Sequence, residues 1–133
     1  MKSILSNGAA PAIGPYSQGI QAGQILFISG QIPLDPSDSQ LVSGGIKPQT
    51  HRVLKNLGAI LKTAGVSFEH VVRTTVFLTD LQDFEAMNEI YSRYFSNVAP
   101  ARSTVQVSAL PKSAMIEIDA IAIIPKRVKD PNI

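Results

Sequence analysis

The segment that decides the fold is the alternating stretch at residues 114–124, Ala-Met-Ile-Glu-Ile-Asp-Ala-Ile-Ala-Ile-Ile. All of its even-numbered positions are apolar, whereas its odd-numbered positions include Glu117 and Asp119. Successive side chains of a strand point to opposite faces of a sheet, so the pattern predicts a strand whose even face meets the core. The odd face is too apolar for open water, yet it carries two carboxylates.

Further strands are predicted around this one. They are indicated by short runs of β-branched and apolar residues that are bounded by turn residues. They lie at residues 17–21 and 25–29, which form a hairpin through Ala22-Gly23, at 71–79 and at 102–108. Within the third run, the alternation places Val72, Val76 and Leu78 on one side of the strand.

Two predicted helices complete the chain. After an irregular loop at about residues 33–48, apolar residues recur at helical spacing over residues 49–64, and Gly65 follows as a left-handed stop. A second helix begins near Asp80 or Asp83, either of which can cap it. Its stripe consists of Phe84, Met87, Ile90, Tyr91, Tyr94 and Phe95. We interpret these aromatic residues as core packing.

Length and composition indicate a single α+β domain over residues 1–133. The chain is 44% hydrophobic and 17% charged, which is typical of a globular protein, and no apolar run approaches the roughly 18 residues of a membrane span. The absence of cysteine excludes disulfides, thiolate metal sites and thiol nucleophiles. A cytoplasmic location is expected, because the start of the chain has no apolar signal segment.

Charge and histidine patterns favour neither a nucleic-acid partner nor a metal. The net charge is +2, and the basic residues are scattered except in the cluster at residues 126–129, which we interpret as a solubility feature. His51 and His70 are isolated, so no metal site is predicted.

The predicted sheet has helices for one face only. Phe77, Ile121 and Ile123 would then form an apolar patch on the other face. Such a patch demands a partner, so we expect an oligomer. Glu117 would lie near the seam between subunits, where pockets commonly form.

Arg102 begins the strand at residues 102–108 and is followed by an uncharged stretch that extends to Leu110. The rigid guanidinium matches a carboxylate with two parallel hydrogen bonds, which makes Arg102 a candidate anchor for a small anionic substrate. The alternative interpretation is a surface salt bridge.

Five segments resemble a known family. They are Ile-Gly-Pro-Tyr-Ser-Gln-Gly at 13–19, Ser-Gly-Gln-Ile-Pro at 29–33, Thr-Thr-Val-Phe-Leu-Thr-Asp-Leu at 74–81, Pro-Ala-Arg-Ser at 100–103 and Ile-Glu-Ile-Asp-Ala-Ile-Ala at 116–122. In this order they resemble the Rid family (RidA/YjgF) of reactive-intermediate deaminases, over residues 3–125. The resemblance implies a chorismate-mutase-like fold with two helices on one face of a mixed sheet. It also implies a homotrimer with three clefts between subunits, and no cofactor.

The resemblance also implies an activity and a set of site residues. The activity is hydrolysis of enamines and imines such as 2-aminoacrylate, 2-iminopropanoate and 2-iminobutanoate to 2-ketoacids and ammonia. Arg102 would hold the substrate carboxylate and Glu117 would handle the water. The remaining pocket positions are Tyr16, Ser29, Gly30, Asn88 and Thr104. Many relatives carry cysteine at the last of these, so a thiol contact is absent here.

Alternatives remain open for the residues and for the function. Glu117 could form a structural ion pair, Tyr16 could simply pack in its loop, and Asn88 could contact a neighbouring loop. A non-catalytic sensor of 2-ketoacids would use Arg102 in the same way but would have no need of a water-activating carboxylate. A ribonuclease or translation inhibitor would require an RNA-binding surface.

Overall fold

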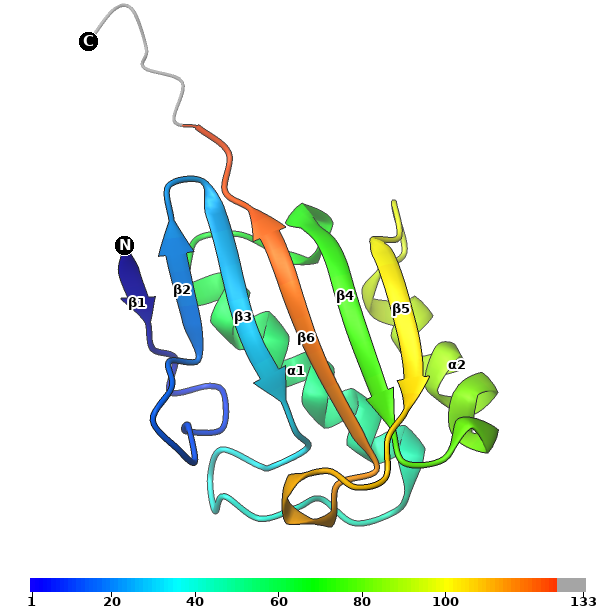
Figure 1. The fold of residues 1–133 in the computed structure, drawn as a ribbon. Coiled ribbons are helices and arrows are strands. Elements are labelled where there is room, and N and C mark those ends of the chain that lie inside the picture. Colours follow the sequence, from blue (N-terminus) through cyan, green and yellow to red (C-terminus); the bar gives the residue numbers. More distant parts are fainter. Residues whose placement is uncertain (127–133) are drawn as a thin grey trace, which may run out of the picture.

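The computed structural model describes residues 1–126 as a six-stranded mixed sheet with two helices (Figure 1). The strands are β1 (Lys2–Ile4), β2 (Gly19–Ala22), β3 (Ile25–Gln31), β4 (Val71–Leu78), β5 (Ala101–Gln106) and β6 (Ile116–Ile123). The helices are α1 (Ile46–Thr63) and α2 (Phe84–Tyr94), with single 3-10 turns at Phe68–His70, Leu81–Asp83 and Pro111–Ser113. Most of the predicted basic cluster at 126–129 lies outside the described residues.

The strand order is β1-β2-β3-β6-β4-β5, in which β4 and β5 run parallel and all other neighbours run antiparallel. A parallel pair needs a crossover connection, and α2 provides it between β4 and β5. Both helices pack on the same face of the sheet (Figure 1). The predicted α+β fold, a mixed sheet with two helices on one face, is therefore confirmed.

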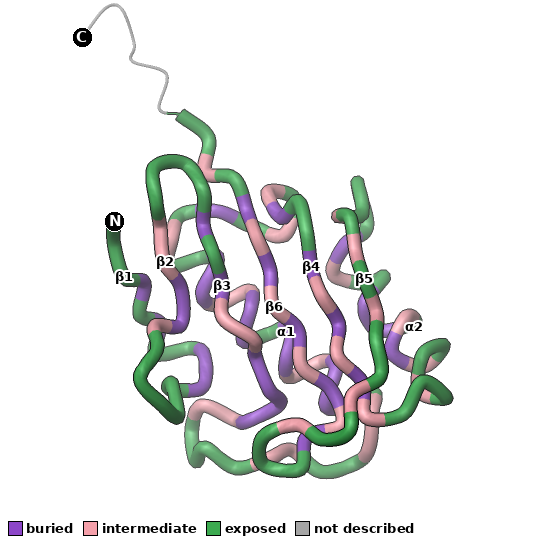
Figure 2. The backbone as a smooth tube through the Cα atoms, viewed as in Figure 1, coloured by how far each residue is buried: buried purple, intermediate pink, exposed green. Residues whose placement is uncertain are grey.

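The core lies between this face and the helices. The even positions of β6 from Ile116 to Ala122 are all buried, as the alternation predicted (Figure 2). The inner side of α1 packs against them through Val53, Leu54 and Leu57. No helix within the described residues is long and apolar enough to cross a membrane.

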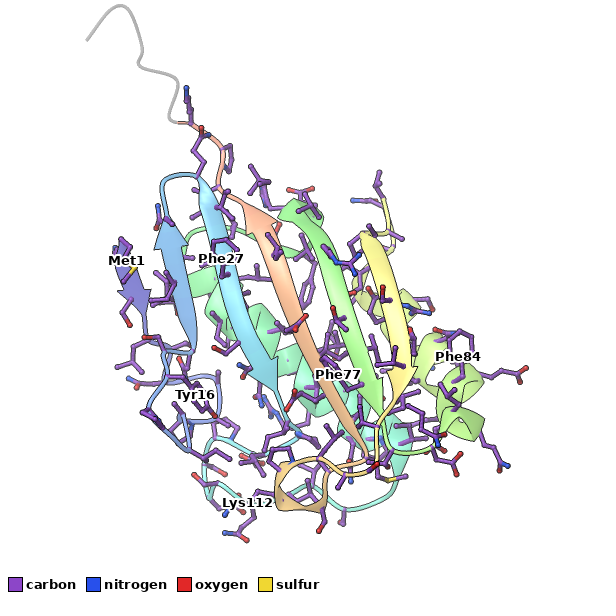
Figure 3. All side chains as sticks on the ribbon, viewed as in Figure 1. Met1, Tyr16, Phe27, Phe77, Phe84 and Lys112 are labelled. Carbon is purple, nitrogen blue, oxygen red and sulfur yellow. The ribbon has the colours of Figure 1, made fainter. Side chains whose placement is uncertain are left out.

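The other face of the sheet has no helix over it. Figure 3 shows Phe27 on β3 and Phe77 on β4 on this open face. Phe27 is 45% exposed, and Ile25 and Ile123 beside it are exposed as well. The predicted apolar patch is thus present, and it extends to β3.

Several element boundaries differ from the prediction. The first helix begins at Ile46 rather than at residue 49, because Pro48 is tolerated in a first turn, where its missing N–H is not needed. Gly65 has φ +83° and ends the helix as predicted. Asp80 caps the 3-10 turn before α2 by accepting from the N–H of Gln82, whereas the Asp83 side chain makes no capping hydrogen bond. Strand β1 was not predicted.

A bulge in β4 overturns one part of the predicted alternation. Val71 is paired with Ala122 and Arg73 with Ile121, so Val72 is an extra residue on β4. The bulge turns Val71 into the core and leaves Val72 46% exposed. The prediction that Val72 shares a side with Val76 was therefore wrong.

Candidate active site

A hollow of about 320 Å³ opens on the helix-free side of the sheet. We call it the Glu117 hollow, and its lining residues are Ile13, Tyr16, Ser29, Gly30, Pro111 and Glu117. Four of these were predicted as site residues from the sequence. Ile13 and Pro111 were not, although Ile13 begins the first family-like segment and Pro111 begins the turn before β6.

A second bulge, in β3, shapes this hollow. Ile28 pairs with Ala120 and Gln31 with Ile118, so Ser29 and Gly30 together face a single residue of β6. The Ser29 hydroxyl donates to the Ser17 carbonyl at 2.6 Å, and its N–H donates to the Gln18 carbonyl at 2.9 Å. These bonds tie the bulge to the chain before β2. Bulges commonly occur next to active sites, where they redirect side chains.

Gly30 leaves room for the Glu117 carboxylate. A Cβ atom at Gly30 would lie 2.6 Å from Oε2 of Glu117, which is shorter than any ordinary contact. Glycine therefore permits this close approach of the Glu117 side chain to the backbone, and a Cβ here would displace the carboxylate. The carboxylate is positioned by the absence of a neighbouring side chain.

The surroundings of Glu117 favour its protonated form more than water does. Partial burial raises the pKa of this carboxyl, and the nearby charge of Asp119 raises it further. Asp119 itself accepts a hydrogen bond from the N–H of Thr75 at 3.1 Å. A carboxyl with a raised pKa is suited both to accept a proton from water and to return one.

Tyr16 both packs in its loop and lines the Glu117 hollow, the two roles that the sequence left open. Its hydroxyl accepts the N–H of Ile13 at 3.2 Å, and its own N–H donates to the Gly14 carbonyl at 2.9 Å. These bonds hold the loop together, so loop packing is real. The ring is nevertheless 47% exposed and lines the hollow.

Pro111, the first residue of the turn at Pro111–Ser113, forms the remaining wall. Lys112 and Ser113 both have φ of 60°, in the left-handed region that residues with a Cβ rarely occupy. Conformations of this kind are often found at functional sites.

Arg102 lies elsewhere. It pairs with Thr74 on β4, and its side chain lies on the helix-covered side, 4.7 Å from the ring centre of Tyr91 and 5.6 Å from that of Phe84. Cation–π contact with the two rings positions the guanidinium without neutralising it. The only ion pairs in the described part of the chain are Lys47–Glu89 and Arg93–Glu89, so the surface salt bridge considered for Arg102 does not form there.

Asn88 and Thr104 belong with Arg102. Asn88 lies on α2 between Phe84 and Tyr91, at the spacing that shares one helix face, and Thr104 follows Arg102 on the same side of β5. The side-chain oxygens Oδ1 of Asn88 and Oγ1 of Thr104 are buried and have no hydrogen-bond partner among the described residues. We call these five residues the Arg102 edge. Its orphaned oxygens mark a polar site that the chain does not satisfy by itself.

One chain keeps the two groups apart. β5 and β6 pair with opposite edges of β4, where Arg102 is the partner of Thr74 and Glu117 is the partner of Phe77. This register and the strand spacing put their Cα atoms about 14 Å apart, and the side chains leave opposite faces of the sheet. A single chain thus brings Tyr16, Ser29, Gly30 and Glu117 together, and separately Arg102, Asn88 and Thr104. No group of three metal-ligating side chains is found within residues 1–126.

Comparison with known proteins identifies the family. Residues 7–124 match the family described as Endoribonuclease L-PSP. Protein DfrA of Myxococcus xanthus is 56% identical over 124 residues, which are 92% of this chain and 95% of that protein. The human 2-iminobutanoate/2-iminopropanoate deaminase is 52% identical over 124 residues, which are 92% of this chain and 90% of the human protein. The structure of E. coli TdcF with bound serine superposes with a TM-score of 0.90 at 41% identity, covering 94% of this chain and 100% of that one.

The fold and the residues of the two groups therefore define a small α+β protein of the Rid type. The chain belongs to the Endoribonuclease L-PSP family, which is the Rid (RidA/YjgF) family that its five segments resemble. Its relatives include proteins named as deaminases at about 50% sequence identity, and also proteins named DfrA and RutC family protein.

Proposed function

We propose that the protein hydrolyses 2-imino acids and their enamine tautomers to 2-ketoacids and ammonia. The observation that carries the proposal is the carboxyl of Glu117, which has a raised pKa and lies in an open hollow against the Gly30 backbone. Two relatives support the substrate class. The human relative is named for this reaction on four- and three-carbon imino acids, and the E. coli relative holds serine.

The chemistry follows from the two charged groups. The imine carbon lies next to a carboxylate, which the guanidinium of Arg102 can hold through two hydrogen bonds. This fixes the carbon for attack, so that orientation contributes to the rate. Glu117 takes one proton from the attacking water and passes it to the imine nitrogen, which gives a carbinolamine. It then passes the proton of the new hydroxyl to the nitrogen, so that the C=O bond forms, the C–N bond breaks and ammonia leaves. Such imines already hydrolyse in water, so a modest acceleration suffices.

The reaction requires two copies of the chain, because one copy separates Arg102 from Glu117. β5 is an edge strand, and the open face carries the exposed Phe27 and Ile25. We infer a ring in which the Arg102 edge of one copy meets the Glu117 hollow of the next. A head-to-tail contact gives a ring when the rotation between copies closes, and an open filament when it does not. The family points to a homotrimer with three clefts. A stable monomer in native mass spectrometry at micromolar concentration would contradict this assembly.

Subunit mixing tests the shared cleft and the reaction together. Arg102→Ala and Glu117→Gln proteins, each inactive alone, would be unfolded, mixed in equal amounts and refolded. If each cleft takes its arginine and its carboxylate from different copies, random assembly restores about one quarter of the clefts. Pyruvate release would be followed while 2-aminoacrylate is generated from serine by a separate dehydratase.

The controls separate the possible failures. Each variant refolded alone must remain inactive, and refolded wild-type protein must recover its rate. If wild-type protein accelerates pyruvate release but the mixture does not, the cleft is not shared as proposed. If wild-type protein gives no acceleration with several imine side chains but binds 2-ketoacids, the protein is a sensor. Cleavage of a short RNA, measured on the same preparations, would instead support a ribonuclease.

A further inference from the structure

A second hollow, of about 440 Å³, lies on the helix-covered side of the molecule. It is formed by α1, by the C-terminal end of α2 at Tyr94, and by the loop that contains Asp35. We call it the Arg52 groove. It shares no lining residue with the Glu117 hollow, so the two hollows are distinct. Figure 1 shows both helices on the face of the sheet opposite to the open face.

The groove has an excess of positive charge. Arg52 and Lys55 both line it, and neither forms a salt bridge within the described residues. Asp35 is the acidic residue in the lining, but its Oδ1 already accepts the N–H and the hydroxyl of Ser37 at 2.9 and 2.7 Å. Asp35 keeps its negative charge, so Arg52, Lys55 and Asp35 together leave the groove with one net positive charge.

Arg52 is held in place by the protein interior. Its Nε donates to Oδ1 of Asn56 at 3.1 Å, one helical turn along α1. Asn56 is 0% exposed, and its Nδ2 donates to the carbonyls of Leu34 and Ile32 at 3.1 and 3.4 Å. The buried amide has no freedom to turn, so it fixes the guanidinium. The two terminal nitrogens of Arg52 keep the planar fork that binds oxyanions.

His51 indicates the same electrostatic character. Its Nδ1 lies 3.0 Å from the hydroxyl of Tyr94, which holds the ring at the groove. Burial lowers the pKa of His51, and the positive charges of Arg93 and Lys55 lower it further. Burial disfavours charge of either sign, but the effect of Arg93 and Lys55 reports a positive potential at the ring, and such a potential favours an anion.

We propose that the Arg52 groove binds a small phosphorylated metabolite, with the phosphate held between Arg52 and Lys55. A phosphate monoester carries about two negative charges at neutral pH, which two cations can match. The groove also falls within the range of about 300 to 1,000 Å³ for small-molecule sites, so there is room for an organic part. Asp35 in the lining disfavours a continuous polyanion such as RNA.

Binding would be measured by isothermal calorimetry on the intact protein, with ribose 5-phosphate, ribose and inorganic phosphate as probes. We expect saturable binding of ribose 5-phosphate and none of ribose. Arg52→Gln should weaken binding by about tenfold or more, since hydrogen bonds to a charged group are lost. The matched control is Lys62→Gln, which removes the same charge from an exposed position on α1 outside the groove, and it should change affinity by less than about twofold.

Three results would overturn the proposal. Equal loss in Arg52→Gln and Lys62→Gln would show attraction to net charge alone. Inorganic phosphate binding as tightly as ribose 5-phosphate would show an adventitious ion only. Tighter binding of a short RNA than of ribose 5-phosphate, with a steep dependence on salt, would show a different partner. Thermal unfolding and imine hydrolysis report on the fold of each variant, and Lys55→Gln replaces Arg52→Gln if the latter unfolds.

Discussion

The Glu117 hollow and the Arg102 edge position their charged groups in opposite ways. Glu117 has its place because a glycine in a strand bulge leaves space for it. Arg102 has its place because two aromatic rings of α2 contact it. The first arrangement is sensitive to any added atom and the second to any removed one. A carboxylate and a guanidinium within the same small domain can therefore be disturbed separately.

The largest expected effect concerns the role of the carboxylate. Glu117→Gln retains the shape of the hollow but removes the base, so kcat should fall by about 10² to 10⁴. Binding of pyruvate or 2-oxobutanoate, measured by calorimetry, should survive because Arg102 is intact. Asp119→Asn is the control, since an amide oxygen can still accept the Thr75 N–H. A Glu117→Gln protein with wild-type turnover would leave orientation by Arg102 and main-chain groups as the source of catalysis.

The next effect concerns the two parallel hydrogen bonds that the guanidinium of Arg102 can donate. Arg102→Lys should fail almost as badly as Arg102→Ala, because an ammonium cannot reproduce two parallel hydrogen bonds. The loss should be roughly 2 to 4 kcal/mol, or about 30- to 1,000-fold in kcat/KM. Steady-state kinetics on both variants measure it. Near-normal kcat/KM for Arg102→Lys would mean that charge alone suffices and that the anchor assignment is wrong.

Gly30→Ala tests the hollow without touching a charge. The new Cβ must displace the Glu117 side chain, whose Oε2, Cδ and Cγ would lie 2.6, 2.8 and 3.0 Å away. A displacement of about 1 Å can cost on the order of 100-fold in rate. The loss should appear in kcat with the oligomer intact, checked by native mass spectrometry. Gly23→Ala, in the β2–β3 turn, has nothing within 4 Å but a φ of +61°, so it is a control that adds backbone strain without a clash.

The smallest effect is a shift in pH dependence. Because Glu117 must be ionised to act as a base, its raised pKa places the acid limb of kcat/KM at a higher pH than for an ordinary glutamate. Asp119→Asn removes the secondary cause of that shift and should move the limb to lower pH. A limb that stays in place would show that burial alone sets the pKa.

The raised pKa of Glu117 also makes the stability of the fold depend on pH. Catalysis needs the ionised carboxyl, whereas the fold is more stable with the protonated one. A carboxyl whose folded-state pKa is raised binds protons more readily when folded, so its contribution is fully present below the unfolded pKa and is lost as pH rises through the folded pKa. Glu117→Gln should therefore unfold at a higher temperature than wild type at neutral pH. The difference should disappear in acid.

Alternation alone predicted which face of the central strand is buried, because β6 is regular from Ile116 to Ile123. It failed at Val72, where a bulge inserts one residue and reverses the alternation. The Ser29–Gly30 bulge was missed for the same reason. A bulge depends on the register between two strands, which the pattern within either strand does not contain.

The separation of Arg102 from Glu117 was also beyond the sequence pattern. Both were assigned to one cleft, but the relation between their faces depends on how β5 and β6 pair with β4. The aromatic stripe of α2 was interpreted as core packing, which holds for the buried Tyr91 but omits its contact with Arg102. Spacing did contain usable signals, since Phe84, Asn88 and Tyr91 share one helix face. Arg52 and Asn56 are likewise one turn apart.

The placement of Arg102 and Glu117 on opposite faces has a genetic consequence. In the proposed ring, each chain lends its arginine to one cleft and its carboxylate to another. A chain that has lost both residues but still folds would silence both clefts that it helps to line, although it is a minority of the assembly. Defective alleles expressed beside a normal copy should therefore be partly dominant, whereas alleles that prevent folding should be recessive.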